Sequence, residues 1–190
     1  MINTDDIKEL LHSRLEEKRY DHSLNVADEA VRLAKLYGAD TEKAYTAGLL
    51  HDVCKNVKNK ELLVSLLKYG IILSDIEKSS HRLWHAMVGA EYIKTEPGIT
   101  DSDIVSAVRY HTTARAKMGI LEKVLYLADF TSADRDYDGV DKMREMVNVS
   151  MDAAMEEALR FTIFDLVQHG RAIHPDTLDA YNEIILAKIK

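Results

Sequence analysis

The chain has 190 residues, of which 46% are apolar, so it is long enough to form one compact domain that buries roughly 70% of its unfolded surface. Its formal net charge of −7 argues against a nucleic-acid groove, because binding a phosphate backbone requires concentrated Lys and Arg side chains. The single Cys54 cannot form an internal disulfide. No segment approaches the ~20 apolar residues of a membrane span, and no N-terminal export signal is seen. We therefore expect a soluble cytoplasmic protein that binds neither nucleic acid nor membranes.

Apolar residues recur with helical spacing along almost the whole chain, and the alternation typical of strands is scarcely seen. In the N-terminal half, Gly38 and Gly70 are expected to end helices, because glycine readily adopts the left-handed conformation that follows a last turn. The helices predicted there are one capped by Thr4 or Asp5 that ends near Lys18, one from about Asp21 to Gly38, one from Thr41 to near Val53, one from Asn59 to Tyr69, and one from Ser79 or Ser80 to Lys94.

Pro97 and Gly98 interrupt the helical pattern near the middle of the chain. The helices predicted after this break run from Asp101 or Ser102 to His111, from Ile120 to Thr131, from Ser150 to about His169, and from Pro175 to Ile189, with a polar loop at 134–139. No internal repeat, low-complexity tract or linker is present. The predicted fold is therefore all-α, a compact helical bundle in a single domain.

A helix of small and apolar residues from Ala44 leads directly into His51 and Asp52. Burying a carboxylate beside an imidazole is costly unless a positive charge neutralises it, and a divalent metal commonly does so. The alternative is a hydrogen-bonded core histidine followed by an incidental aspartate near a helix end. The pair by itself does not decide between these interpretations.

Other polar residues interrupt apolar helices in the same way. The full set, spread over five predicted helices, is His22, His51, Asp52, His85, His111 and Asp129. Asp129 is expected near a helix C-terminus, where the helix dipole disfavours a carboxylate unless a cation compensates it. If the bundle brings these residues together, imidazole and carboxylate ligands suit Fe, Mn, Zn, Co or Ni. His81 could pair with His85 on one helix face, but its polar neighbours indicate an exposed residue, and His12 and His169 are expected on the surface.

Basic residues near this set are candidates for binding an anionic substrate. Lys55 stands four residues after His51, so within a continuing helix it would lie one turn further along on the same side. Arg19, Arg135 and Arg171 are further candidates. For each of the four, the alternative is an ordinary solvated surface cation.

The order of His22, His51-Asp52 and Asp129 resembles the signature of the HD-domain metal-dependent phosphohydrolases. His85 and His111 resemble the additional histidines of the subset that can hold a second metal. A closer resemblance, to the bacterial YqeK family of symmetrical diadenosine tetraphosphate hydrolases, covers nearly the whole chain. The motifs that carry it are Arg19-Tyr20-Asp21-His22, Ala47 through Lys55, His111-Thr112-Thr113, Ala128-Asp129, Asp134-Arg135 and Gly170-Arg171-Ala172-Ile173-His174-Pro175.

This resemblance implies a single HD domain over residues 1–190, whose C-terminal helices close a nucleotide site. It implies a divalent metal, with iron expected and Mn, Zn, Co or Ni as alternatives. His85 and His111 could bind a second metal, protonate the leaving phosphate or hydrogen-bond phosphoryl oxygens. The metal ligands would be His22, His51, Asp52 and Asp129. The catalytic residues would be Asp52, Lys55, His85 and His111. The substrate-binding residues would be Arg19, His22, Lys55, His85, His111, Thr112, Arg135, Arg171, Ile173 and His174.

The chain departs from the family pattern at two places. Ala114 stands where the family has glycine after the His-Thr-Thr run, and Thr131-Ser132-Ala133 replaces Ile-Glu-Pro. Both changes spare the expected ligands and affect the geometry of the neighbouring loops.

The expected reaction is hydrolysis of diadenosine tetraphosphate to two ADP. A bound divalent cation lowers the pKa of water from 15.7 toward roughly 7, so that a metal-bound hydroxide can attack the phosphoanhydride. The alternatives are another HD-type nucleotidase or phosphodiesterase, a noncatalytic metal-bearing nucleotide sensor, or a purely structural helical module. The expected partner is a small-molecule nucleotide. A homodimer through apolar residues of the 59–76 region is a further expectation, with packing against the bundle as its alternative; these residues include Leu62, Leu63, Leu66 and Leu67.

Overall fold

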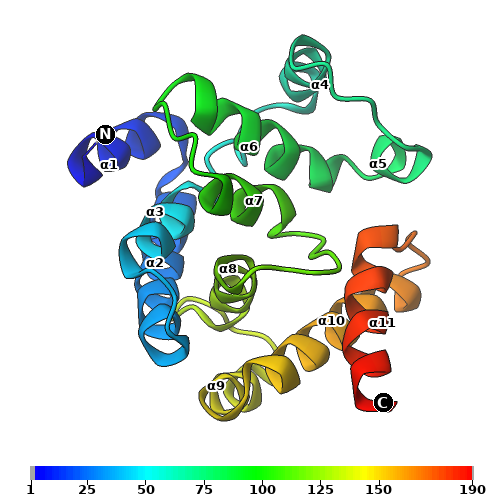
Figure 1. Cartoon of the computed structure of the whole chain (residues 1–190). Coiled ribbons are helices and arrows are strands. Elements are labelled where there is room, and N and C mark those ends of the chain that lie inside the picture. The colour runs from blue at the N-terminus through cyan, green and yellow to red at the C-terminus, as the bar shows by residue number, and fades with distance from the viewer. Residues whose placement is uncertain (1–2, 190) are drawn as a thin grey trace.

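The computed structural model describes residues 3–189, and within this range it consists of helices, turns and loops without strands (Figure 1). The all-α prediction is therefore confirmed. The helices are α1 (Thr4–Arg14), α2 (Glu17–Tyr37), α3 (Thr41–Leu50), α4 (Asn59–Lys68), α5 (Asp75–Ser79), the 3-10 turn η1 (His81–Leu83), α6 (Trp84–Thr95), α7 (Ser102–Tyr110), α8 (Ile120–Thr131), α9 (Val140–Val149), α10 (Met151–Gln168) and α11 (Pro175–Ile189).

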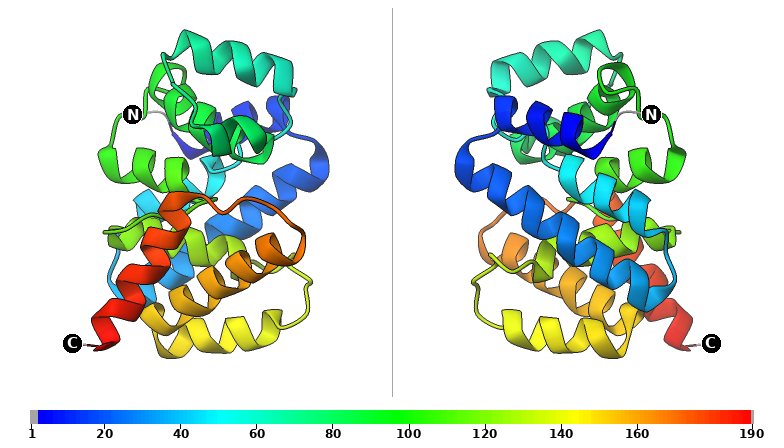
Figure 2. Two further views of the ribbon diagram at one scale, coloured as in Figure 1. Left: turned by 90° about the vertical axis from the view of Figure 1, so that its right-hand side faces the viewer. Right: turned by 90° about the vertical axis from the view of Figure 1, so that its left-hand side faces the viewer.

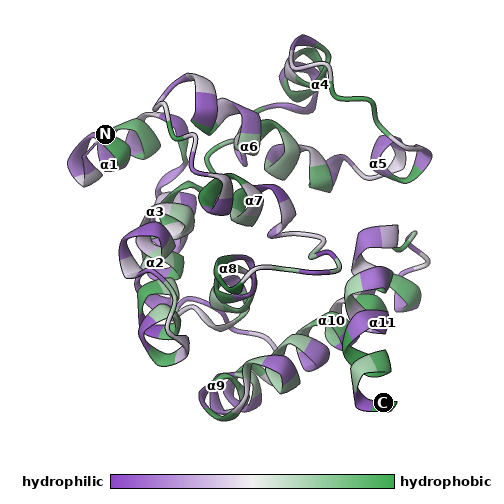
Figure 3. Cartoon of the chain, viewed as in Figure 1, coloured by the Kyte–Doolittle hydropathy of each residue, from purple (hydrophilic) through white to green (hydrophobic). Residues whose placement is uncertain are grey.

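Helix α8 lies at the centre of the bundle and packs against α2, α3, α7, α9 and α10. Figure 1 shows it end-on with these helices around it, and Figure 3 shows the apolar residues that it presents to them. Leu121, Val124, Leu125 and Leu127 are all buried. A helix that is apolar on several sides is stable only when neighbours cover it, so α8 is the element around which the others assemble.

Helices on either side of this centre form two groups. Helices α1, α4 and α6 lie toward one end of the molecule, and α9, α10 and α11 lie toward the other (Figure 2). Helix α4 packs on α6, and α11 packs on α10. No helix in residues 3–189 combines the length and apolar character needed to cross a lipid bilayer.

The first helix boundary differs from the prediction. Helix α1 ends at Arg14 instead of Lys18, and the Asn3 side chain caps it by accepting a hydrogen bond from the Asp6 amide at 2.9 Å. Leu15 takes an extended conformation and is buried in the core, which ends α1 and allows α2 to begin at Glu17. His22 consequently lies in the second turn of α2 and not in the first.

Helix α3 ends at Leu50, three residues before the predicted end near Val53. The chain continues as tight turns in which the Lys55 amide donates to the Asp52 carbonyl at 2.8 Å, while Val53 and Cys54 are fully buried. The expectation that Lys55 follows His51 by one α-helical turn is therefore wrong. Lys55 is positioned by this turn segment.

Three further elements differ from the predictions. Helix α5 was not predicted, and it is short, beginning with a capping box between Ser74 and Glu77. Helix α9 was also not predicted, although Val140, Met143 and Val147 form its buried face. The helix predicted from Ser79 or Ser80 begins at Trp84, after the η1 turn. On α4, Leu62 and Leu66 pack inward whereas Leu63 and Leu67 are exposed, and the predicted dimer stays a prediction.

Gly48 permits an unusually close approach of α2 and α3. A Cβ atom at this position would lie 2.5 Å from the Ala27 Cα and 2.9 Å from the Ala27 amide nitrogen. Both contacts are with backbone atoms, which cannot rotate away. The approach also brings together the His22 and His51 rings, whose centroids are 5.3 Å apart.

We predict that Gly48→Ala destabilises the protein by at least about 1–3 kcal/mol, because the two helices must separate. Gly89→Ala is the matched control, since its added Cβ would meet only side-chain atoms, the nearest at 3.5 Å. That substitution should raise stability by roughly 0.5–1 kcal/mol through helix propensity. Urea unfolding monitored by circular dichroism measures both changes, and equal effects of the two substitutions would contradict the packing argument.

Candidate metal centre and substrate cavity

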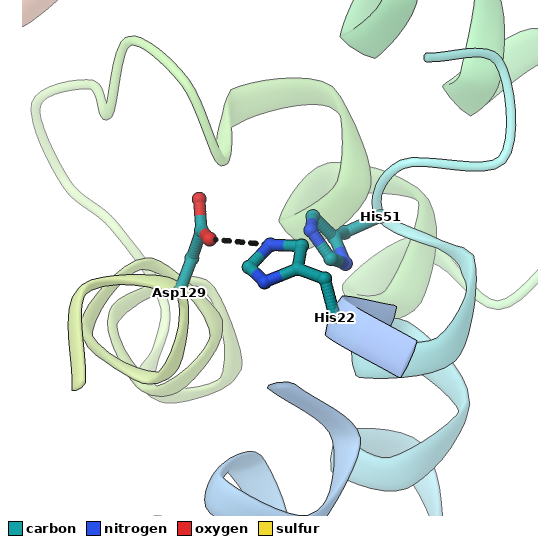
Figure 4. A group of neighbouring side chains, drawn as sticks. All are labelled: His22, His51 and Asp129. Carbon is teal, nitrogen blue, oxygen red and sulfur yellow. Dashed lines mark ion pairs between the residues drawn. The ribbon is translucent and has the colours of Figure 1, made fainter. Parts of the chain in front are cut away.

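Six polar side chains come together where α2, α3, α6, α7 and α8 meet, and in chain order they are His22, His51, Asp52, His85, His111 and Asp129. His51 and His111 occupy the residue just after the last turn of α3 and of α7. Figure 4 shows His22, His51 and Asp129 directed toward one another from separate elements.

The nitrogen and oxygen atoms of this cluster are closely spaced. Ligand atoms of His22, His51 and Asp129 lie within 4.8 Å of one another, and His22 Nε2 is 3.0 Å from Asp129 Oδ1. Ligand atoms of His51, Asp52 and His111 also lie within 4.8 Å of one another, so His51 belongs to both groups. Donors at about 2 Å from a common ion lie no more than about 4 Å apart, so small side-chain rotations would close either group around a cation.

Three buried atoms in the cluster have no aligned hydrogen-bond partner: His22 Nε2, His51 Nε2 and Asp52 Oδ1. His22 Nε2 is close to Asp129 but is not oriented to form a hydrogen bond with it. Leaving a buried polar atom unpaired costs about 1–3 kcal/mol, and more when the group is charged. A divalent cation would satisfy all three atoms together, so these residues fit a metal.

Backbone hydrogen bonds fix the two histidines at the helix ends. His51 Nδ1 lies 2.7 Å from the Gly48 carbonyl, and His111 Nδ1 lies 2.8 Å from the Val108 carbonyl. A carbonyl can only accept, so Nδ1 carries the proton in both rings. In the neutral rings the Nε2 lone pairs are then available to the cluster, as a metal ligand requires.

Asp134 was not predicted as a site residue, but it orients His22. Its Oδ2 lies 2.7 Å from His22 Nδ1, opposite the ring nitrogen that faces Asp129. Burial opposes ionisation of Asp134, but the charge and hydrogen bond of His22, together with hydrogen bonds from Ser132 and the backbone, lower the net pKa of the carboxyl group. The sequence placed Asp134 beside Arg135 in a polar loop and gave no indication of which residue it contacts.

Cations and imidazoles surround the Asp52 carboxylate. Arg19 Nη1 lies 2.9 Å from Oδ2, while His85 Nε2 lies 3.0 Å and Lys55 Nζ 3.7 Å from Oδ1. Although burial opposes ionisation, His51 above all, and then His111 and His85, hold the pKa of Asp52 well below its usual range. Asp52 therefore provides a negative charge at the centre of the cluster.

Asp129 is held as an anion in the same way. Burial again opposes ionisation, but His22 and Arg135 lower the pKa of this carboxyl group strongly. Arg135 donates to the carboxylate and, at 2.6 Å, to the backbone carbonyl of Asp129. The predicted basic residues Arg19 and Arg135 thus pair with the carboxylates of the cluster.

A cavity of about 860 Å³ lies between the α5–η1 segment and the α10–α11 loop, and Lys55, Thr112 and Phe130, which neighbour cluster residues, are among the residues that line it. Four predicted residues line it: Lys55, Thr112, Arg171 and His174. Arg19, His22, His85, His111, Arg135 and Ile173 do not, and Arg171 lies 3.8 Å from Asp165. Two aromatic residues that line the cavity were not predicted. Phe130 directly follows Asp129, so its position in the sequence could have indicated it, whereas nothing in the sequence around Phe161 on α10 indicates a site residue.

The remaining histidines lie where the sequence indicated. His12, His81 and His169 are exposed, and His81 contacts Asn59 and packs its ring against Trp84 instead of pairing with His85.

The departures from the family pattern also have local consequences. Ala114 adopts a left-handed conformation with φ of 57°, which explains why glycine suits this position. Thr131 donates to Glu29 at 2.8 Å and so ties α8 to α2.

Residues 19–134 match the model of the HD domain family, described as "HD domain". The chain belongs to this family. The full-length relatives include proteins named "Bis(5'-nucleosyl)-tetraphosphatase, symmetrical". The one from Halalkalibacterium halodurans is 37% identical, with 97% of this chain and 98% of the relative covered. The one from Bacillus subtilis is 33% identical with the same coverage of both chains.

A solved structure supports the same relationship. It is described as a "predicted HD superfamily hydrolase involved in NAD metabolism" from Clostridium acetobutylicum. It superposes with a TM-score of 0.95 at 36% identity and covers 98% of this chain and 99% of its own. The resemblance to HD-domain proteins and to symmetrical tetraphosphatases is thereby confirmed in sequence and in fold.

We predict that Asp134→Ala lowers the affinity for a divalent metal by about 10–100-fold, because His22 loses the acceptor that orients its ring. Asp138→Ala, an exposed aspartate in the same loop, is the matched control and should leave affinity unchanged. Competition with a chromogenic chelator under anaerobic conditions measures both affinities. An unchanged affinity in Asp134→Ala would exclude the orienting role.

Proposed function

We propose that this protein is a metal-dependent hydrolase that cleaves diadenosine tetraphosphate and one water into two molecules of ADP. The observation that carries the proposal is the cluster of unpaired buried donor atoms, which is connected to the 860 Å³ cavity through Lys55, a cavity residue 3.7 Å from Asp52. Its relatives named as symmetrical tetraphosphatases cover nearly the whole chain, including the α10–α11 loop that contributes to this cavity.

The residues that would hold the metal are His22, His51, Asp52 and Asp129. Mixed imidazole and carboxylate donors suit Fe, Mn, Zn, Co or Ni, and we propose iron as the native ion. A divalent cation at this position lowers the pKa of coordinated water and so supplies a nucleophile at neutral pH. His85 and His111 have Nε2 atoms 3.1 Å apart, both facing Asp52, and would hold a second cation.

Other groups would bind the phosphate chain. The Lys55 ammonium lies at the cavity, 3.3 Å from His85 Nε2, and can offset negative charge on phosphoryl oxygens. The buried Thr112 hydroxyl lines the same cavity without a hydrogen-bond partner and can donate to a phosphate. Arg171 and His174 approach from the α10–α11 loop, so the C-terminal helices would close the nucleotide site.

His85 is suited to proton transfer or hydrogen bonding. Burial lowers the pKa of its imidazole to about 4, although Asp52 opposes this effect. The ring is therefore neutral at pH 7 and retains a lone pair. In a site that holds a single cation, this lone pair would accept a hydrogen bond from the attacking water, whereas with a second cation it would be a ligand instead.

We predict that the metal-loaded protein converts diadenosine tetraphosphate to ADP as the single nucleotide product. Because the bond broken is the central anhydride, AMP and ATP should not form. Chromatography of products from a panel of dinucleoside polyphosphates tests this directly. Formation of AMP plus ATP, or release of phosphate from mononucleotides alone, would instead indicate another HD-type phosphodiesterase or nucleotidase.

We further predict that Asp52→Ala remains folded but loses metal and turnover together, because this residue would be both a ligand and the charge that organises the cluster. Circular dichroism, elemental analysis and product chromatography on the same preparation separate folding, metal and activity. Full turnover by a metal-free Asp52→Ala variant would contradict the proposal. A wild-type protein that binds metal without any turnover would instead be a nucleotide sensor.

A further inference from the structure

A second cavity, of about 420 Å³, opens beside the first on the side of α4. Both volumes fall in the range of roughly 300–1,000 Å³ that is usual for small-molecule sites. The residues that line the second cavity are Lys55, Val57, Asn59, Leu62, His81, Arg82 and His85. Four of these side chains also line the first cavity: Lys55, Asn59, His81 and Arg82.

Both cavities are lined by residues that belong to the metal cluster or lie next to it. Lys55 borders both of them and lies 3.7 Å from Asp52 Oδ1. His85 lines only the second cavity and lies 3.0 Å from the same oxygen. On the other side, Thr112 lines only the first cavity and directly follows His111. A molecule at the cluster can therefore extend in two directions.

The second cavity carries groups that suit a nucleoside diphosphate. Leu62 is buried and Val57 half-buried, so they offer an apolar surface to a base. The His81 ring is held by Trp84, with ring centroids 4.3 Å apart, and by the Asn59 amide at 3.2 Å. Arg82 has no ion pair or side-chain hydrogen bond within residues 3–189, so its charge is free to meet a phosphate.

The shape of the substrate matches this arrangement. Diadenosine tetraphosphate consists of two identical ADP halves joined at the central anhydride, so symmetrical cleavage requires one half on each side of the reacting bond. Under the proposed function, the first cavity would bind one half. We propose that the second cavity binds the other ADP half, with the phosphate chain crossing from one cavity to the other beside Lys55. This inference rests on the proposed function and adds a second nucleoside subsite to it.

The test compares two substrates that differ at one end. Adenosine 5'-tetraphosphate has the same four phosphates as diadenosine tetraphosphate but a single adenosine. Val57→Glu places a carboxylate in the second cavity alone. It should lower the ratio of kcat/KM for diadenosine tetraphosphate to that for adenosine 5'-tetraphosphate by at least about tenfold. Val64→Glu, the same change on the exposed face of α4 outside both cavities, should leave the ratio at its wild-type value.

Equilibrium dialysis with ADP measures the number of ADP molecules bound per chain and does not depend on turnover. The metal-loaded wild type should bind two ADP per chain, and Val57→Glu should bind one. Symmetrical cleavage by a wild type that binds a single ADP, with an unchanged substrate ratio in Val57→Glu, would overturn the second subsite and leave the proposed function standing. Absence of symmetrical cleavage in the wild type would overturn both.

Discussion

The site depends on one electrostatic constraint, which is that the buried Asp52 carboxylate lies 3.5 Å from His51 Nε2, and neither that nitrogen nor Asp52 Oδ1 has an aligned hydrogen-bond partner. Arg19 donates a hydrogen bond to Asp52 Oδ2 at 2.9 Å. Asp52 Oδ1 lies near His85 Nε2 and the Lys55 ammonium but has no aligned hydrogen bond. A protein interior tolerates such a group only when a cation completes it. The four proposed ligands come from α2, the end of α3 and α8, so a single ion would connect three helices of the bundle.

Close packing of α2 and α3, which involves no charged side chain, sets the geometry of this cluster. The absence of a side chain at Gly48 lets α3 approach the backbone of α2 at Ala27, and the same glycine offers the carbonyl that fixes the His51 ring. Residues next to the cluster line two neighbouring cavities. Binding of one ADP half in each cavity would account for cleavage at the central anhydride without any two-fold symmetry in the chain.

Much of this could be predicted from the sequence. Helical periodicity indicated an all-α fold, and polar residues within apolar helices identified the six side chains that the structure brings together. The features that were missed depend on tertiary contacts. Helix α1 ends earlier than predicted because Leu15 packs in the core. Helix α9 was not predicted because its few buried residues stand among charged neighbours in the sequence. Asp134 gave no sign of its partner, since His22 is 112 residues away in the chain. The ligand roles of the six side chains stay predictions.

The most direct test of the central claim is anomalous X-ray diffraction from crystals of the anaerobically prepared, metal-loaded protein, measured on both sides of the absorption edge of the ion. This account predicts a strong anomalous peak at about 2.0–2.2 Å from His22 Nε2, His51 Nε2 and oxygens of Asp52 and Asp129. A peak bound elsewhere, or a crystal without metal whose His22, His51 and Asp52 atoms remain unpaired and buried, would contradict it.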